Sequence, residues 1–165
     1  MVYMKKISLK QLLILRLALM AVTCTIGAIS AQDTAVTQKT YENGVLTLGG
    51  IQFKIPTGFN EVESEQDVST AGDAEHIDGT TVDTEVSADF AQGTQKLDIK
   101  VGLKNNGKID TLNLPGAQKK TINGKDGYFW TEADDEGTEY NFEYIQDGKV
   151  VKIETYNEGL ISQVI

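Results

Sequence analysis

Apolar and polar side chains alternate along much of the chain after residue 45, and a period of two predicts β-strands. The clearest run covers residues 97–103, where Leu97, Ile99, Val101 and Leu103 fall on one side. Charged residues at positions 96, 98, 100 and 104 fall on the other side. A sheet with one buried and one hydrated face produces this pattern.

The segment 127–154 predicts three consecutive antiparallel strands that contribute to the core. A polar break at 134–137 separates the first two strands, and Asp147-Gly148 supplies the positive-φ pair of a hairpin turn before the third. Aromatic side chains recur at alternate positions, at Tyr128 and Trp130 in the first strand and at Tyr140, Phe142 and Tyr144 in the second. Residues at such spacing are more often core than a binding platform.

The rest of the chain completes a sheet and a closing helix. Residues 45–55 predict a bent strand or a hairpin that stops at Pro56, and residues 119–122 predict a hairpin into the central strands. Residues 60–80 form the least structured stretch, with a short helix at 61–68 as one option. Asn157 is suited to cap a C-terminal helix with one apolar side. We therefore expect an α+β fold, a single antiparallel sheet of about six to seven strands with a short C-terminal helix packed on it, over residues 45–165.

The N-terminus predicts export. Residues 1–31 combine a positive start, an apolar stretch and small residues before Gln32, which is typical of a cleaved signal peptide. The alternative is a retained membrane anchor, although Arg16 leaves a short apolar run against the roughly 20 residues that a spanning helix needs. Residues 32–44 are expected to be a flexible leader. The predicted location is secreted or at the extracytoplasmic cell surface.

Charge and cysteine content narrow the function classes. Cys24 lies inside the predicted signal, so the mature chain has no disulfide and no thiolate chemistry. Residues 32–165 carry 11 basic and 24 acidic side chains, a net charge of −13. Such a surface repels nucleic acid and anionic lipid, and it permits cations or a basic partner. Membrane contact is expected only through an uncleaved N-terminal segment.

The acidic segment 132–143 partly matches the ligand positions of a twelve-residue calcium-binding loop. Carboxylates stand at positions 1, 3, 5 and 12 of that loop, and oxygen ligands in this pattern suit calcium. Position 1 is Glu rather than Asp, Glu139 occupies an apolar position, and both flanks are strand-like, so an acidic hairpin loop is the simpler interpretation. The candidate metal ligands are Glu132, Asp134, Glu136 and Glu143. Apart from calcium, no cofactor is expected.

Complete catalytic motifs are missing. The chain has neither G-x-S-x-G nor H-E-x-x-H, and His76 is the one histidine. Gly102-x4-Gly107-Lys108 falls short of a phosphate-binding loop because Ile109 stands where the magnesium-binding Ser or Thr is required. We name no catalytic and no cofactor-binding residue, although paired carboxylates of a hydrolase stay open.

Two segments suggest a family. Residues 50–59, GIQFKIPTGF, resemble the F-x-I-P-x-G-F/Y opening of a group of small exported, uncharacterised proteins of methanogenic archaea. Residues 120–128, KTINGKDGY, with the later Phe142-x-Tyr144 and Gly148-Lys149-x-Val151, resemble the second half of that group. The resemblance carries no known activity. The strand order with a closing helix is also similar to PsbP-like folds, which would imply architecture only.

Three functions follow as hypotheses. The first is a non-catalytic exported domain that acts as an extracytoplasmic interaction module toward a protein or cell-surface partner. The second is a cation-binding (calcium) accessory domain that uses the 132–143 loop or the acidic run at 61–89. The third is a carboxylate-based hydrolase.

Overall fold

The computed structural model describes residues 39–62 and 68–165, with the backbone alone for residues 68–76. The predicted signal peptide and residues 32–38 lie outside the described residues. No helix in the described part is long and apolar enough to cross a membrane.

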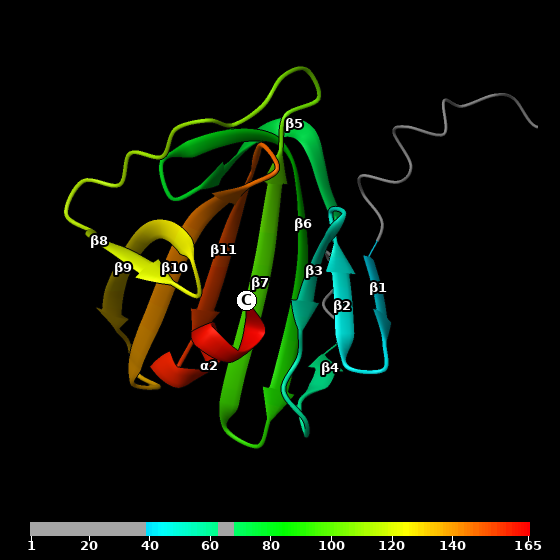
Figure 1. Cartoon of the computed structure of the whole chain (residues 1–165), viewed down its shortest axis with the longest axis vertical. Coiled ribbons are helices and arrows are strands. Elements are labelled where there is room, and N and C mark those ends of the chain that lie inside the picture. Colours follow the sequence, from blue (N-terminus) through cyan, green and yellow to red (C-terminus); the bar gives the residue numbers. More distant parts are fainter. Residues whose placement is uncertain (1–38, 63–67) are drawn as a thin grey trace, which may run out of the picture. The chain divides into compact units, whose positions relative to one another are not determined.

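The described chain is mostly β-strand, with one short helix near its end (Figure 1). The elements are β1 (Lys39–Glu42), β2 (Val45–Leu48), β3 (Ile51–Lys54), β4 (Asn60–Val62), β5 (Val68–Ile77), β6 (Thr80–Gln92), β7 (Gln95–Leu103), β8 (Gln118–Ile122), β9 (Lys125–Ala133), β10 (Thr138–Gln146), β11 (Lys149–Thr155) and α2 (Glu158–Val164).

The strands form two antiparallel sheets rather than the single sheet that the alternation predicts. The larger sheet has the order β4-β6-β7-β11-β10-β9-β8, and β5 also pairs with β6. The smaller sheet has the order β1-β2-β3. Its β2–β3 turn consists of Gly49 and Gly50, both at positive φ. The chain reverses direction at Gly49-Gly50, so β2 and β3 pair with each other, and with β1 they form a sheet separate from the larger one.

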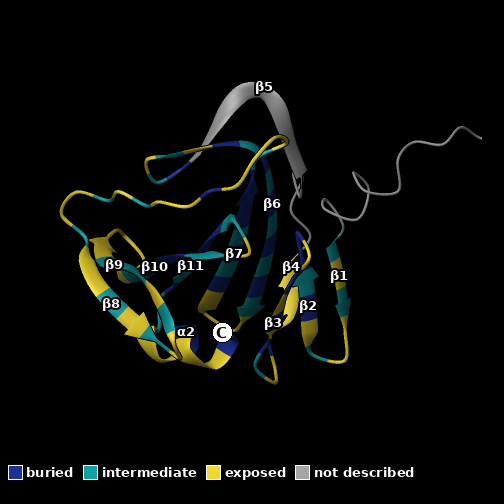
Figure 2. Ribbon diagram, turned by 45° about the horizontal axis from the view of Figure 1, so that its top comes forward, coloured by how far each residue is buried: buried dark blue, intermediate teal, exposed yellow. Residues whose placement is uncertain are grey.

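The smaller sheet and α2 pack on one face of the larger sheet, here called the core face. Leu46, Leu48 and Phe53 of the smaller sheet share a buried cluster with Val86, Leu97, Ile99, Phe142, Ile153 and Ile161, among others. Figure 2 shows buried residues concentrated along β6 and β7, and exposed residues gathered along β8 and β9. The core face therefore holds the main hydrophobic core.

The C-terminal helix forms as its sequence predicts. Asn157 has extended φ and ψ, and its side-chain Oδ1 accepts a hydrogen bond from the Gly159 amide at 3.1 Å. Leu160, Ile161 and Val164 are buried. A helix of seven residues is marginal in water, so its packing on the core face stabilises it.

Two segments predicted as loose are structured. β1 lies inside the expected flexible leader, where the Tyr41 ring packs edge-on against Phe90 with centroids 5.0 Å apart. β5 lies inside the stretch expected to be least structured, and residues 61–62 of the optional helix belong to β4. Pairing with β6, which is 13 residues long, supplies backbone hydrogen bonds that side-chain periodicity does not reveal.

The central meander is confirmed as β9, β10 and β11, but its aromatic residues divide between two faces. Phe142 and Tyr144 are buried on the core face. Phe129 lies opposite Phe142, so Tyr128 and Trp130 point to the opposite face, here called the second face. That face also holds a smaller apolar cluster of Ile77, Val82, Ile109 and Val150.

Candidate functional site

Polar side chains on the second face lie in rows that cross the strands. One row runs from β7 to β8 through cross-strand partners: Lys100, Lys152, Glu143, Tyr128 and Lys119. The next row contains Asp89, Asp98, Glu154, Asn141 and Trp130. Directly opposed residues on one face of an antiparallel pair interact most strongly, so the side chains within each row influence one another's charge and contacts.

A buried charge cluster occupies the middle of this face; we define it as Asp78, Glu143, Lys152 and Glu154. Lys152 forms ion pairs with Asp78 at the β5–β6 turn and with Glu154 Oε1, the latter at 2.6 Å. Glu154 Oε2 also pairs with Lys100 at 2.8 Å. Only 11% of the Lys152 side chain and 12% of the Glu154 side chain are exposed. The Asp78 side chain is more accessible, with 37% exposed. The Lys152–Glu154 pair is largely shielded from water, so salt screens it little.

Glu143 is the least solvated member of the buried charge cluster. It is 0% exposed, and its Oε1 accepts a hydrogen bond from Thr80 Oγ1 at 3.5 Å. Its Oε2 has no hydrogen-bond partner among the described residues. Burial, reinforced by the charge of Asp78, raises the pKa of Glu143 to about 8. The carboxyl is therefore a neutral acid at pH 7.

The pKa values of two carboxyl groups in the neighbouring row are also shifted. Asp98 lies opposite both Asp89 and Glu154, and burial together with these two charges raises its pKa to about 6. Lys152 and Lys100 have the opposite effect on Glu154, and its pKa lies below the ordinary value even though burial alone would raise it. The same face thus contains a protonated glutamic acid and an ionised glutamate on adjacent strands.

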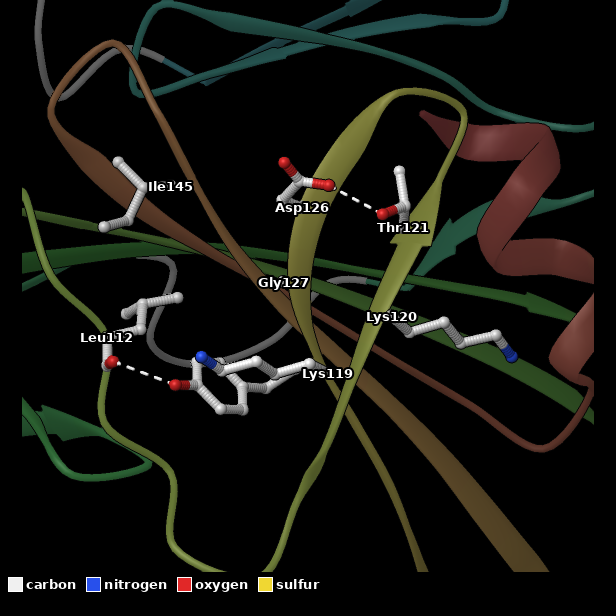
Figure 3. Close-up of a pocket in the computed structure, with 8 residues that line it drawn as sticks. Leu112, Lys119, Lys120, Thr121, Asp126, Gly127 and Ile145 are labelled. Atoms are coloured by element: carbon white, nitrogen blue, oxygen red, sulfur yellow. Dashed lines mark hydrogen bonds between the residues drawn. The ribbon is translucent and has the colours of Figure 1, made fainter.

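A cleft of about 460 Å³ lies where this face reaches β8 (Figure 3). We call it the β8 cleft; its lining residues are Leu112, Lys119, Lys120, Thr121, Asp126, Gly127, Tyr128 and Ile145. Tyr128 OH donates to the Leu112 carbonyl at 3.3 Å, and Thr121 Oγ1 donates to Asp126 Oδ1 at 2.6 Å. Lys119 Nζ lies 5.9 Å from the centre of the Tyr128 ring, whereas Figure 3 shows Lys120 pointing away toward α2. The cleft is therefore apolar and aromatic on one side and cationic at its rim.

The four candidate calcium ligands have other partners or positions. Glu132 Oε1 accepts from Trp130 Nε1 at 3.2 Å, and Glu136 pairs with Lys96. Asp134 accepts from the amides of Glu136 and Gly137 and from the Tyr156 hydroxyl.

The fourth candidate, Glu143, is buried in the middle of β10. Within residues 39–62 and 68–165, no group of three or more His, Cys, Asp or Glu side chains is arranged to hold a metal ion. The calcium interpretation stays a prediction.

The near phosphate-binding loop has a packing explanation. Gly102 lies opposite Val150 in the sheet, and a Cβ there would meet side-chain atoms of Val82, Val150 and Ile77 at 2.5 to 2.8 Å. Residues 104–117 form irregular backbone rather than the helix that a phosphate site needs. His76 lies in β5 opposite Thr81, and its side chain is outside the described part.

Sequence reasoning missed the buried charge cluster. Glu143 and Lys152 both alternate with apolar residues, and that pattern predicts a hydrated face. The turn at Asp78 and the irregular segment after β7 instead lie against this face. No local signal in the sequence indicates that burial.

Comparison with protein-family models, curated proteins and solved structures gives no match for this chain.

Proposed function

We propose that this chain is a non-catalytic interaction domain that acts outside the cytoplasm and binds an extended acidic polypeptide segment at the β8 cleft. The observation that carries the proposal is the position of the Lys119 ammonium and its lack of an ion-pair partner in the described part of the chain. The ammonium lies 5.9 Å from the centre of the Tyr128 ring at the rim of the cleft, and it has no carboxylate partner among the described residues.

Charge makes this position unusual for the molecule. The chain has 24 acidic and 15 basic side chains, yet β8 carries two adjacent lysines and no acid. Lys120 lies over the Phe129 ring at 3.9 Å and pairs with Glu158 at 2.7 Å. Lys119 is left as a cation whose attraction is available to a ligand. A complementary partner is therefore anionic.

The backbone of β8 favours a polypeptide as that partner. In the described sheet β8 pairs with β9 alone, so its other side is a free edge. Lysines on an edge strand discourage pairing with neutral or basic strands. An acidic strand would convert that repulsion into cross-strand ion pairs while it gains backbone hydrogen bonds. The edge thus selects its partner by charge.

The lining of the β8 cleft supports binding rather than hydrolysis. Among its eight lining residues, the single carboxyl belongs to Asp126, which Thr121 already occupies. A carboxylate hydrolase needs two carboxyl groups that converge on one substrate. Half-buried aromatic and aliphatic side chains beside a cation instead form a recognition surface.

Fluorescence anisotropy tests the proposal with two labelled peptides, one of alternating Glu and Val and one of alternating Lys and Val. The purified chain should bind the acidic peptide, and added salt should weaken this binding. The Lys119→Gln variant should bind the acidic peptide about fivefold more weakly, because one exposed charge pair contributes roughly 1 kcal/mol to the binding free energy. Lys54→Gln, at an exposed lysine of β3, serves as the control and should leave affinity unchanged. Equal binding of both peptides, or full affinity in the Lys119 variant, would refute the proposal.

A further inference from the structure

The contact between Lys152 and Asp78 has the parts of a covalent cross-link. Lys152 lies in the middle of β11, and its ammonium touches a carboxylate oxygen of Asp78 at the tip of the β5–β6 hairpin. That oxygen is buried and has no other partner among the described residues. The two residues are far apart in sequence, so a bond between them would close a long loop through the centre of the sheet.

A third group stands beside this pair. Glu143 is the direct cross-strand neighbour of Lys152, and Thr80, two residues after Asp78, donates a hydrogen bond to Glu143 Oε1. The register places Glu143 directly beside Lys152, and the charge of Asp78 is near enough to raise the pKa of the Glu143 carboxyl. Its Oε2 is buried and has no hydrogen-bond partner within the described part of the chain. Because burial keeps this carboxyl protonated at neutral pH, it can donate a proton where an ordinary glutamate cannot.

Aromatic and apolar groups lie around the reacting atoms, although 37% of the Asp78 side chain is exposed. The Trp130 ring centre lies 5.4 Å from Lys152 Nζ. Ile77 precedes Asp78, Val150 is two residues before Lys152, and both are buried in the apolar cluster of the second face. The reacting oxygen, Asp78 Oδ2, is itself buried. Burial of the reacting atoms in contact with each other favours condensation over hydrolysis.

We propose that Lys152 and Asp78 form an intramolecular isopeptide bond, with Glu143 as the proton shuttle. A proton moves from the Lys152 ammonium to the Asp78 carboxylate and leaves a neutral amine and a neutral acid. The Nζ lone pair attacks Cγ of Asp78 while Glu143 donates a proton to the carbonyl oxygen. The tetrahedral adduct loses one C–O bond, and the oxygen leaves as water with the second proton from nitrogen. Glu143 recovers its proton when the amide carbonyl reforms, so the reaction needs no oxidant and no co-reactant.

Glu154 opposes this reaction. Its carboxylate pairs with Lys152 from the other side, and the charges of Glu154 and Asp78 hold the pKa of Lys152 above its ordinary value despite burial. The neutral amine is thus a minor species, and we expect the bond to form slowly after folding. Glu154→Gln removes the main competitor for the ammonium and should speed formation. Lys100, the other cation that faces Glu154, does not contact Asp78 in the structure.

Peptide mapping of the purified chain tests the bond directly. Without a link, trypsin releases residues 55–96 as one peptide, because no Lys or Arg lies between 54 and 96, and it cleaves after Lys152. With the link, trypsin cannot cleave after Lys152, so residues 55–96 should appear joined to residues 150–165. The mass of this species should equal the sum of the two peptide masses minus one water. Recovery of only the unlinked peptides after prolonged incubation of the folded chain would overturn the proposal.

Variants separate the bond from a purely structural ion pair. Asp78→Ala and Lys152→Met should abolish the linked peptide. Glu143→Gln keeps the shape and the neutral charge of the acid, so the protein should fold, but it should form the link at least tenfold more slowly. Lys100→Met is the control for loss of a lysine from the same row and should retain the link. A linked peptide that forms at the normal rate in the Glu143 variant would refute the shuttle role of Glu143.

Discussion

Gly102 offers a sharp test of packing on the second face. A Cβ at this position would lie 2.5 Å from Val82 Cγ1, 2.7 Å from Val150 Cγ1 and 2.8 Å from Ile77 Cδ1. Real carbon contacts are much longer, so Gly102→Ala must displace buried methyl groups. Overpacking costs about 1–3 kcal/mol, against a gain of about 0.5–1 kcal/mol from replacing glycine inside a strand. We expect a net loss of about 1–2 kcal/mol in the free energy of unfolding.

A double-mutant cycle distinguishes this cause from a general effect on the strand. Val82→Ala alone should destabilise, because Val82 is 2% exposed and its loss leaves a cavity. In the Gly102→Ala background the same change also makes room for the new methyl group, so the two losses should sum to less than expected by about 1 kcal/mol. Val86→Ala is the matched control, because Val86 is equally buried but belongs to the main core.

Urea unfolding followed by circular dichroism gives each free energy, with the slope of the transition as a check for two-state behaviour. Additivity within about 0.5 kcal/mol for Gly102 with Val82 would refute the packing argument, as would coupling of the same size with Val86.

Four further measurements test the structure. Gly127→Ala should cost about 2–3 kcal/mol in urea unfolding, because its Cβ would lie 2.3 Å from the Glu143 carbonyl oxygen, and no side-chain substitution can relieve a backbone contact. Asn157→Ala should lower the free energy of unfolding by about 1 kcal/mol through loss of the helix cap, and Asn157→Ser should largely restore it. The folded pKa of Glu143, about 8, lies above its unfolded value, so the folded state keeps a proton that the unfolded state releases. Stability should therefore fall as pH rises from about 5 to 8, by up to about 1.4 kcal/mol per pH unit from this group, and the slope should flatten in Glu143→Gln. A thermal melt with millimolar calcium at fixed ionic strength tests the 132–143 site: a rise in melting temperature that sodium does not give would support the site, and equal melts would count against it.

The sequence predicts those parts of the fold that depend on local periodicity. The strands of the meander, their Asp147-Gly148 turn and the capped closing helix each follow from spacing within about ten residues. Both turn residues have positive φ, as the hairpin requires. Such features need no knowledge of distant partners.

Long-range contacts decide what the sequence could not predict. β5 has few large apolar residues, and its pairing with β6 alone places it in the sheet. Lys152 alternates with Val151 and Ile153 as a hydrated residue would, yet the hairpin tip at Asp78 covers it. A residue's burial depends on what packs against its face, and periodicity identifies the face without identifying that neighbour.

The order of the strands has a consequence for how this chain can fold. β11 is the last strand in sequence, yet it lies in the interior of the larger sheet between β7 and β10. Until residues 149–155 are made, β7 and β10 each keep an unsatisfied edge, and the two halves of the sheet stay separate. Pairing across about 50 residues makes such topologies fold in milliseconds to seconds rather than microseconds. A nascent chain without residues 149–155 would therefore expose two unpaired strand edges, so the larger sheet can close only after β11 has been made.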